Sequence, residues 1–253
     1  NGTVSGAEWN LTSGYNGYGA YTFEGGGGDY IYSSLTPPQS GQTLSLWVNT
    51  TSSTIESIAG WSDGIPTSAT HDRELYMNAD GTVTYRIWDG AEKRINSTTT
   101  INDGQYHHIA VGYSPGNGIW MYIDANYEGL TSSSAPFNSY TTPYFTLGIE
   151  SEQQNYFDGK IDDVLIFNRS LSEEQVYALS QSRRDVIVAN ETQEGDIWKC
   201  KVHPFDEKEV GNTVESNNLT IAFYDDVNPE VSDISPIGTT HGTGALINIS
   251  ANV

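Results

Sequence analysis

One stretch of the chain reads Tyr156-Phe-Asp-Gly-Lys-Ile-Asp-Asp-Val-Leu-Ile-Phe-Asn-Arg-Ser-Leu-Ser-Glu-Glu-Gln-Val176. Its first part, Lys160–Asn168, is rich in β-branched and aliphatic residues and predicts a strand. Its second part predicts a helix over Ser172–Ser180, because Ser172 is a favourable N-cap and Gln175 occupies the capping-box position. The chain is therefore expected to pass here from a sheet into one short helix.

Upstream of this stretch the sequence predicts strands almost throughout, with turn residues between them. The predicted strands are Ala20–Phe23, Asp29–Ser33, Thr43–Asn49, Ser57–Trp61, Glu74–Asn78, Thr82–Asp89, Tyr106–Tyr113, Gly118–Ile123 and Phe145–Ile149. Ala79-Asp80-Gly81 predicts a tight hairpin, and the alternation in Thr82–Trp88 predicts one buried face. Strands at this spacing without intervening helices predict an antiparallel sandwich rather than a βαβ fold.

The charge and the cysteine count exclude several classes of function. The 253 residues include 32 Asp and Glu against 11 Lys and Arg, which gives a formal net charge of −21. Nucleic acids and anionic membranes are bound through clustered basic residues, so we expect neither as a partner. A single cysteine, Cys200, excludes an intrachain disulfide and a Cys-based zinc site. No apolar run approaches the roughly 20 residues that span a bilayer.

Glycosylation sequons occur along the whole chain. The eight Asn-X-Ser/Thr positions are Asn1, Asn10, Asn49, Asn96, Asn168, Asn190, Asn218 and Asn248. Such sites are modified outside the cytoplasm, so they predict an extracellular or cell-surface glycoprotein. The alternative is that Thr-rich strands and Asn-rich turns produce sequons by chance.

Four ordered motifs resemble the laminin-G-like, or concanavalin A-like, jelly-roll family. They are Tyr156–Val176 with its Asp-Asp and Asn-Arg-Ser-Leu-Ser, Tyr21-Thr-Phe-Glu24 with Asp29-Tyr-Ile31, Gly104-Gln-Tyr-His-His-Ile-Ala-Val111, and Trp120-Met-Tyr-Ile-Asp-Ala125. The resemblance covers residues 1–180. It implies an all-β, antiparallel jelly-roll β-sandwich with one short C-terminal helix, followed by Ig-like β segments.

The remaining chain is similar to the Ig-like modules of archaeal and bacterial surface proteins. We expect a partial Ig-like module over residues 186–224 and the start of another over 229–253. Alternation places Cys200 on one face with Trp198, which predicts a buried thiol. The alternative is that Cys200 pairs with a cysteine outside the given sequence. The apolar run Ala245–Val253 ends abruptly, so we interpret the chain as a piece of a longer protein.

The resemblance also implies a calcium site between the early glycine-rich loop and the last strand. Its candidate ligands are Glu24, Asp29, Asp162 and Asp163, because Ca²⁺ prefers carboxylate and carbonyl oxygens. Adjacent strand residues point to opposite faces, so Asp162 and Asp163 are not both expected to chelate one ion. The alternative is that these two carboxylates hydrogen-bond neighbouring backbone groups.

No catalytic motif is present in the sequence. Related jelly-roll glycanases use a Glu-X-Asp-X-X-Glu strand pattern, and Glu150-Ser-Glu152 lacks the central Asp. His107 and His108 point to opposite sides of a strand, so we expect structural roles rather than a shared metal site. We therefore predict a protein that is not an enzyme.

Aromatic residues and long loops supply the candidate ligand-binding residues, because aromatic rings stack on sugars and loops often carry binding sites. These candidates are Trp61, His71, Arg73, Tyr85 and Trp88, with Tyr76 beside them, whereas Trp47, Trp120 and Trp198 are expected to fill cores. We expect adhesion or recognition of glycan or cell-surface protein ligands. The alternative is a structural subunit of a filament, sheath or surface layer, which would self-assemble through strand pairing at the end of the chain.

Overall fold

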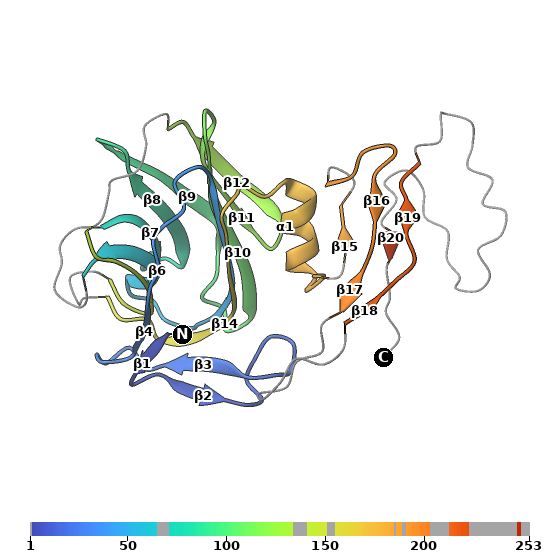
Figure 1. Ribbon diagram of the computed structural model, residues 1–253. Coiled ribbons are helices and arrows are strands. Elements are labelled where there is room, and N and C mark those ends of the chain that lie inside the picture. The colour runs from blue at the N-terminus through green and yellow to red at the C-terminus, as the bar shows by residue number, and fades with distance from the viewer. Residues whose placement is uncertain are drawn as a thin grey trace. The chain divides into compact units, whose positions relative to one another are not determined.

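The computed structural model describes residues 2–64, 71–133, 141–150, 155–184, 186–188, 191–202, 213–222 and 247–248. The chain divides into two compact units, Asn1–Arg183 and Arg184–Val253. The first unit consists of two packed sheets and one short helix, which confirms the all-β jelly-roll fold (Figure 1). No helix in the described part of the chain is long and apolar enough to cross a membrane.

Sheet A contains seven antiparallel strands in the order β1-β4-β13-β6-β7-β8-β9. Their bounds are β1 Thr3–Ser5, β4 Tyr30–Ser34, β6 Glu56–Asp63, β7 His71–Met77, β8 Thr82–Trp88, β9 Glu92–Thr100 and β13 Pro143–Leu147. The predicted hairpin joins β7 to β8. In its turn, the Gly81 N–H donates to the Asn78 carbonyl oxygen at 2.9 Å, and Gly81 adopts a φ of 84° that favours glycine.

Sheet B also contains seven antiparallel strands, in the order β12-β11-β10-β5-β14-β3-β2. Their bounds are β2 Glu8–Asn10, β3 Ala20–Phe23, β5 Gln42–Asn49, β10 Tyr106–Ser114, β11 Gly118–Ile123, β12 Asn126–Thr131 and β14 Gly159–Phe167. The stretch Tyr156–Val176 supplies β14, which pairs with β3 on one side and β5 on the other.

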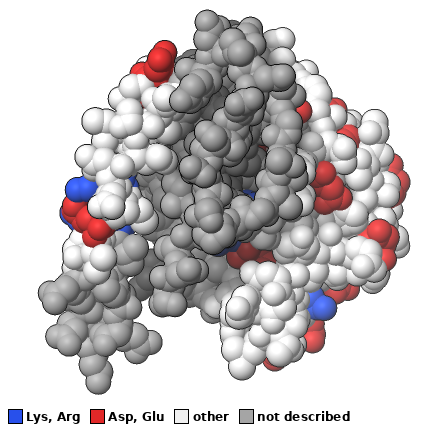
Figure 2. Space-filling view, turned by 90° about the vertical axis from the view of Figure 1, so that its right-hand side faces the viewer, with Lys and Arg blue, Asp and Glu red and all other residues white. Residues whose placement is uncertain are grey.

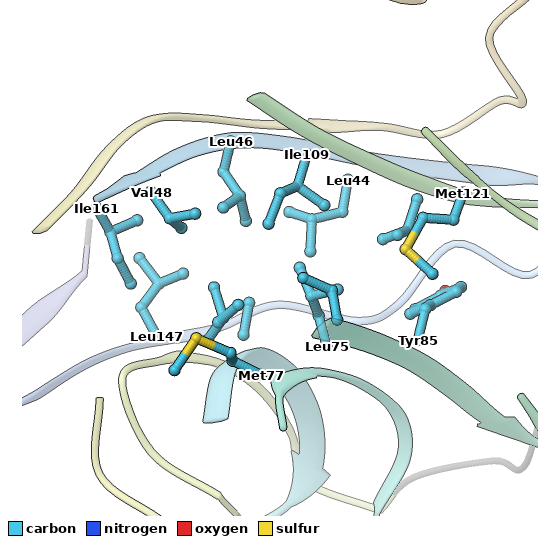
Figure 3. Packing of buried hydrophobic residues seen from close by; sticks show 14 of the residues in the cluster. Leu44, Leu46, Val48, Leu75, Met77, Tyr85, Ile109, Met121, Leu147 and Ile161 are labelled. Atoms are coloured by element: carbon cyan, nitrogen blue, oxygen red, sulfur yellow. The ribbon is translucent and has the colours of Figure 1, made fainter. Parts of the chain in front are cut away.

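The core lies between the two sheets, where every second side chain of a strand points inward. From sheet B, Leu44, Leu46 and Val48 of β5 face Leu75 and Met77 of β7 in sheet A (Figure 3). All five side chains are at most 1% exposed. The predicted alternation of Thr82–Trp88 is confirmed in β8, where Val83, Tyr85 and Ile87 belong to the core and Trp88 is exposed.

The helix α1, Glu173–Ser180, covers part of the outer face of sheet B. Ser172 caps it, and Gln175 completes the predicted capping box. Val176 packs with Ala110 and Trp120, which point away from the main core. Part of the outer face of sheet B is therefore a second, smaller core.

The edges of the sandwich expose little unpaired strand. The edge strands β1 and β2 have three residues each. The other two edge strands, β9 and β12, contact each other: Glu128 accepts a hydrogen bond from the Thr98 N–H at 2.7 Å, and the Thr131 hydroxyl donates to the Arg94 carbonyl at 2.8 Å. Short or covered edges of this kind disfavour pairing with another chain.

The second unit contains three two-stranded pairs in its described part. They are β15 Val186–Ile187 with β20 Ile247–Asn248, β16 Ile197–Trp198 with β19 Leu219–Thr220, and β17 Lys201–Val202 with β18 Val214–Glu215. Two residues of the final apolar run thus pair within the chain. The division of this unit into two Ig-like modules stays a prediction.

The prediction of a buried Cys200 was wrong. Cys200 is exposed, and Trp198 beside it is only partly buried. Alternation shows which side chains share a face, but it does not show whether another layer covers that face.

Candidate functional site

The outer face of sheet A carries a polar cluster at the hairpin of β7 and β8. In β7, Leu75 and Met77 point into the core, so Glu74 and Tyr76 point outward. The register places Arg86 of β8 directly opposite Glu74. The tight turn between the strands fixes this pairing, and the apolar neighbours fix the face.

Arg86 joins three carboxylates on this face. Its Nε donates to a Glu74 oxygen at 2.6 Å, and its two terminal nitrogens lie 3.4 Å from Glu150 and 3.5 Å from Glu92. The guanidinium also lies 5.6 Å from the centre of the Tyr76 ring, which is a cation–π contact. The Glu74 side chain is only 5% exposed, so this pair is well shielded from solvent. The network therefore fixes the positions of its charged groups.

A pocket of about 210 Å³ opens beside this network. It is lined by Ile55, Ser57, Glu74, Tyr76, Arg86, Glu150 and Asn155. Ser57 is 1% exposed, and its hydroxyl has no hydrogen-bond partner among the described residues. A buried hydroxyl without a partner is costly, and a ligand hydroxyl in the pocket could pair with it.

The pocket combines hydrogen-bond acceptors with donors around one aromatic ring. Glu74 and Glu150 only accept, Arg86 only donates, and Asn155 does both. The Asn155 side-chain amide donates to Glu150, which ties the two ends of this loop together. Such a mixed set suits a ligand rich in hydroxyl groups. Glu152, the other carboxylate of the predicted Glu150-Ser-Glu152 pair, lies outside the described residues.

Three of the predicted ligand-binding residues are buried in the sandwich, and the prediction was wrong for them. Trp61 and Tyr85 are 1% exposed and belong to the main core. Arg73 is 0% exposed, and its guanidinium donates to the Gln42 side chain of sheet B at 2.8 Å. These large side chains fill the space between the sheets rather than face a ligand. The side chain of His71 lies outside the described part of the chain.

Trp88 does lie on the outer face of sheet A. It is two residues from Arg86 on the same face of β8 and is 45% exposed. Tyr76 lines the pocket itself. These two aromatic residues are the predicted candidates that the structure leaves accessible near the network.

The four predicted calcium ligands lie in two separate places. The pairing of β3 with β14 runs from Phe23 opposite Gly159 to Tyr21 opposite Ile161. Glu24 lies just beyond the first end of this pairing, and Asp162 lies just beyond the other end. Asp29 accepts from the Glu24 N–H at 2.7 Å. The described residues contain no group of three or more His, Cys, Asp or Glu side chains that could hold a metal ion. The four residues therefore do not fit one calcium site.

Asp162 and Asp163 have backbone roles. Asp162 accepts from the Tyr15 N–H at 3.0 Å and from the Asp163 N–H at 2.7 Å. Asp163 has a φ of 48°, at a point where the register of β14 with β5 shifts. The two contacts of the Asp162 carboxylate agree with the alternative that it hydrogen-bonds neighbouring backbone groups, and for the Asp163 carboxylate this alternative stays a prediction.

The adjacent histidines have separate structural environments, as expected. His107 contacts Asp124 at 2.7 Å and Asp103 at 3.1 Å, and the hydrogen bond to Asp124 is the main cause that raises its pKa. His108 is 1% exposed and contacts the Ser45 hydroxyl at 2.8 Å. Burial lowers the pKa of His108 to about 4, so this histidine is neutral at pH 7.

The sequons differ in their accessibility. Asn10, Asn96, Asn168 and Asn218 are exposed, whereas Asn49 lies in β5 between two neighbouring strands and donates to the Gly104 carbonyl at 2.6 Å. Asn1 and Asn190 lie outside the described residues, as does the side chain of Asn248. Glycosylation at any of them stays a prediction.

Sequence reasoning missed Ser57, Glu74 and Arg86. The sequence did contain a signal for the Glu74–Arg86 pair. Counting residues along both strands from the turn at Asp80 places Glu74 and Arg86 opposite each other, as they are in the structure. Ser57 had no comparable signal, since its place in the pocket involves Tyr76, which lies opposite it on β7, and the distant Asn155, whose carbonyl accepts from the Ser57 N–H at 2.7 Å.

Solved structures that share this fold come from different organisms. Domain 4 of an extracellular arabinanase from Geobacillus stearothermophilus, in complex with arabinotriose, is 18% identical over 71% of this chain and 88% of that chain, with a TM-score of 0.57. A heptameric pentraxin from Limulus polyphemus is 17% identical over 63% of this chain and 80% of that chain, with a TM-score of 0.50. At this level of identity the likeness shows the fold.

The receptor-binding domain of botulinum neurotoxin type G has a TM-score of 0.56 and 12% identity over 74% of this chain. The match covers 47% of that domain, so this chain spans about half its length. No curated protein matches the chain. The family model Laminin_G_3, of the concanavalin A-like lectin/glucanases superfamily, matches residues 24–177, so the chain belongs to this family.

Proposed function

We propose that this domain recognises carbohydrate through the pocket on the outer face of sheet A and acts without catalysis outside the cell. The observation that carries the proposal is the buried Ser57 hydroxyl, which has no hydrogen-bond partner among the described residues and lies beside the Tyr76 ring and the Arg86 network. Sugars combine hydroxyl groups with apolar ring faces, and this pocket offers matching partners for both. At about 210 Å³ the pocket suits one sugar residue rather than a long chain.

The neighbouring folds support a binding role. The arabinanase domain was solved with arabinotriose, and another neighbour is from botulinum neurotoxin type C, whose entry into cells depends on interaction with two ganglioside molecules. Several of the neighbours are binding domains. The carboxylates in the pocket support binding rather than hydrolysis, because Glu74 and Glu150 both hold Arg86.

The proposal is tested by glycan binding with a panel of neutral and acidic oligosaccharides. Tyr76→Ala should weaken the binding of any captured glycan by about tenfold or more, because it removes the only aromatic ring among the described residues that line the pocket. Ser57→Ala should weaken it less, by about fivefold, because it removes one hydroxyl. Titration calorimetry measures both effects.

Tyr127→Ala is the matched control, since Tyr127 is 57% exposed on β12 of sheet B. It should leave glycan affinity unchanged. A panel without any bound glycan would overturn the proposed function. Equal losses of glycan affinity from Tyr76→Ala and Tyr127→Ala would show that the glycan does not bind in this pocket.

A further inference from the structure

The charges around the pocket leave an excess of negative charge. Glu74, Glu92 and Glu150 surround Arg86, and Arg94 contacts Glu92 from the other side. Among the described residues, three carboxylates therefore face two guanidinium groups. The first unit's segments outside the described residues, 65–70, 134–140 and 151–154, contain no Lys or Arg, and the last contains Glu152. Their sequence therefore supplies no Lys or Arg to offset this excess.

The guanidinium and amide donors in the pocket are already committed to carboxylates. The Arg86 guanidinium contacts Glu74, Glu150 and Glu92, and the Asn155 amide donates to Glu150. A ligand carboxylate or sulfate group can only accept hydrogen bonds, so it would have to displace one of these carboxylates in order to pair with Arg86. If it accepted from the Ser57 hydroxyl instead, its negative charge would lie in the same pocket as Glu74 and Glu150. A hydroxyl group can donate to a bound carboxylate and accept from Ser57 without breaking an ion pair.

We infer that the pocket selects uncharged sugars and rejects acidic ones, such as sialic acids, uronic acids and sulfated sugars. This inference rests on the proposed function and names the ligand class of the same site. The wider surface acts in the same direction, because the net charge is −21. Among the described residues on the face displayed in Figure 2, acidic side chains are more widespread than basic ones. Like charge repels an approaching anion most strongly at low ionic strength.

The experiment compares glycans in matched pairs of one neutral and one acidic member. The probes are lactose with 3′-sialyllactose, and methyl-esterified with de-esterified oligogalacturonides, titrated into the full chain at low salt. We expect the neutral member of any bound pair to bind at least about tenfold more tightly, with a smaller ratio at high salt. Equal or tighter binding of the acidic member would overturn the inference and leave the proposed function intact. No binding of either member, here or across the wider panel, would overturn both.

A variant that neutralises one carboxylate of the pocket distinguishes the effect of the pocket from the effect of the net charge. Glu150→Gln removes one carboxylate beside Arg86 and keeps an oxygen that can still accept from it. It should reduce the preference for neutral sugars about fivefold, because one repelling charge is lost. The control is Glu173→Gln in the first turn of α1, on the opposite face of the sandwich, which changes the net charge equally. Equal shifts from both variants would assign the preference to net charge and overturn a role for the pocket.

Discussion

The outer faces of the two sheets differ in what covers them. On sheet B, α1 packs over Ala110 and Trp120, and the Tyr15 ring stacks on Trp47 at 3.3 Å between ring centres. On sheet A, the hairpin of β7 and β8 presents Arg86, Tyr76 and a pocket to solvent. Aromatic residues on the first face therefore contribute to stability, whereas polar and aromatic residues on the second remain available to a ligand.

The largest expected effect comes from removing a tryptophan on the covered face. Trp120→Ala should lower the free energy of unfolding by about 3–5 kcal/mol, because the ring is 6% exposed and packs against α1. The matched variant Trp88→Ala, at a residue 45% exposed on sheet A, should cost about 0.5 kcal/mol. Urea unfolding measures both. Equal costs would contradict the distinction between the two faces.

A smaller effect is expected from breaking the charge network on sheet A. Arg86→Met removes the guanidinium from Glu74, whose side chain is 5% exposed, and should cost about 2–4 kcal/mol in unfolding free energy. The double variant Arg86→Met with Glu74→Met should recover most of this loss, because the buried carboxylate is removed too. Urea unfolding of the three proteins checks the prediction. A single variant as stable as the wild type would show that the network is not held as described.

The buried histidine of sheet B should make stability depend on pH. The pKa of His108 falls from 6.5 to about 4 on folding, mainly through burial, although Asp124 acts in the opposite direction. Below pH 6.5 the unfolded chain binds a proton that the folded chain does not, so stability falls as the pH drops toward 4. The contribution of His108 amounts to about 2 kcal/mol between pH 7 and pH 5.

The variant His108→Gln should remove this part of the acid sensitivity. It retains a side chain that can hydrogen-bond Ser45 and lacks a group that titrates. Urea unfolding at pH 7 and pH 5 should show a smaller loss for the variant than for the wild type. Equal losses of stability in the variant and the wild type would show that the protonation of His108 does not cause the acid sensitivity.

The smallest expected effect concerns calcium. Glu24 with Asp29 and Asp162 with Asp163 lie at opposite ends of the β3–β14 pairing, so calcium should leave the melting temperature of EDTA-treated protein unchanged. Differential scanning fluorimetry with magnesium as the control measures this. A rise specific to calcium would show a site formed by other residues or by a rearrangement of these loops.

Much of the fold could be predicted from local sequence. The capping box of α1 and the Asp80 turn involve neighbouring residues, and the structure has both. Alternation correctly indicated that Thr82–Trp88 has one buried face. It also places Tyr85 and Trp88 on opposite faces, which argued against assigning both to one ligand site.

The site was less predictable because it depends on which sheet face stays open. Large aromatic side chains such as Trp61 and Tyr85 suit a sugar-binding surface and a core equally well from sequence alone. Only the packing of the two sheets against each other shows that these rings are inside. The pocket also joins β6, β7 and β8 to Glu150 and Asn155, which are distant in sequence and are brought together by the sheet order.

Hydrogen exchange with and without a bound neutral glycan reports which of the two outer faces holds the ligand. We expect added protection of backbone amides in β7 and β8 and around Ser57 and Asn155, with β10, β11 and α1 unchanged. Protection confined to β10, β11 or α1 would instead place the ligand on the covered face of sheet B and would rule out the pocket on sheet A.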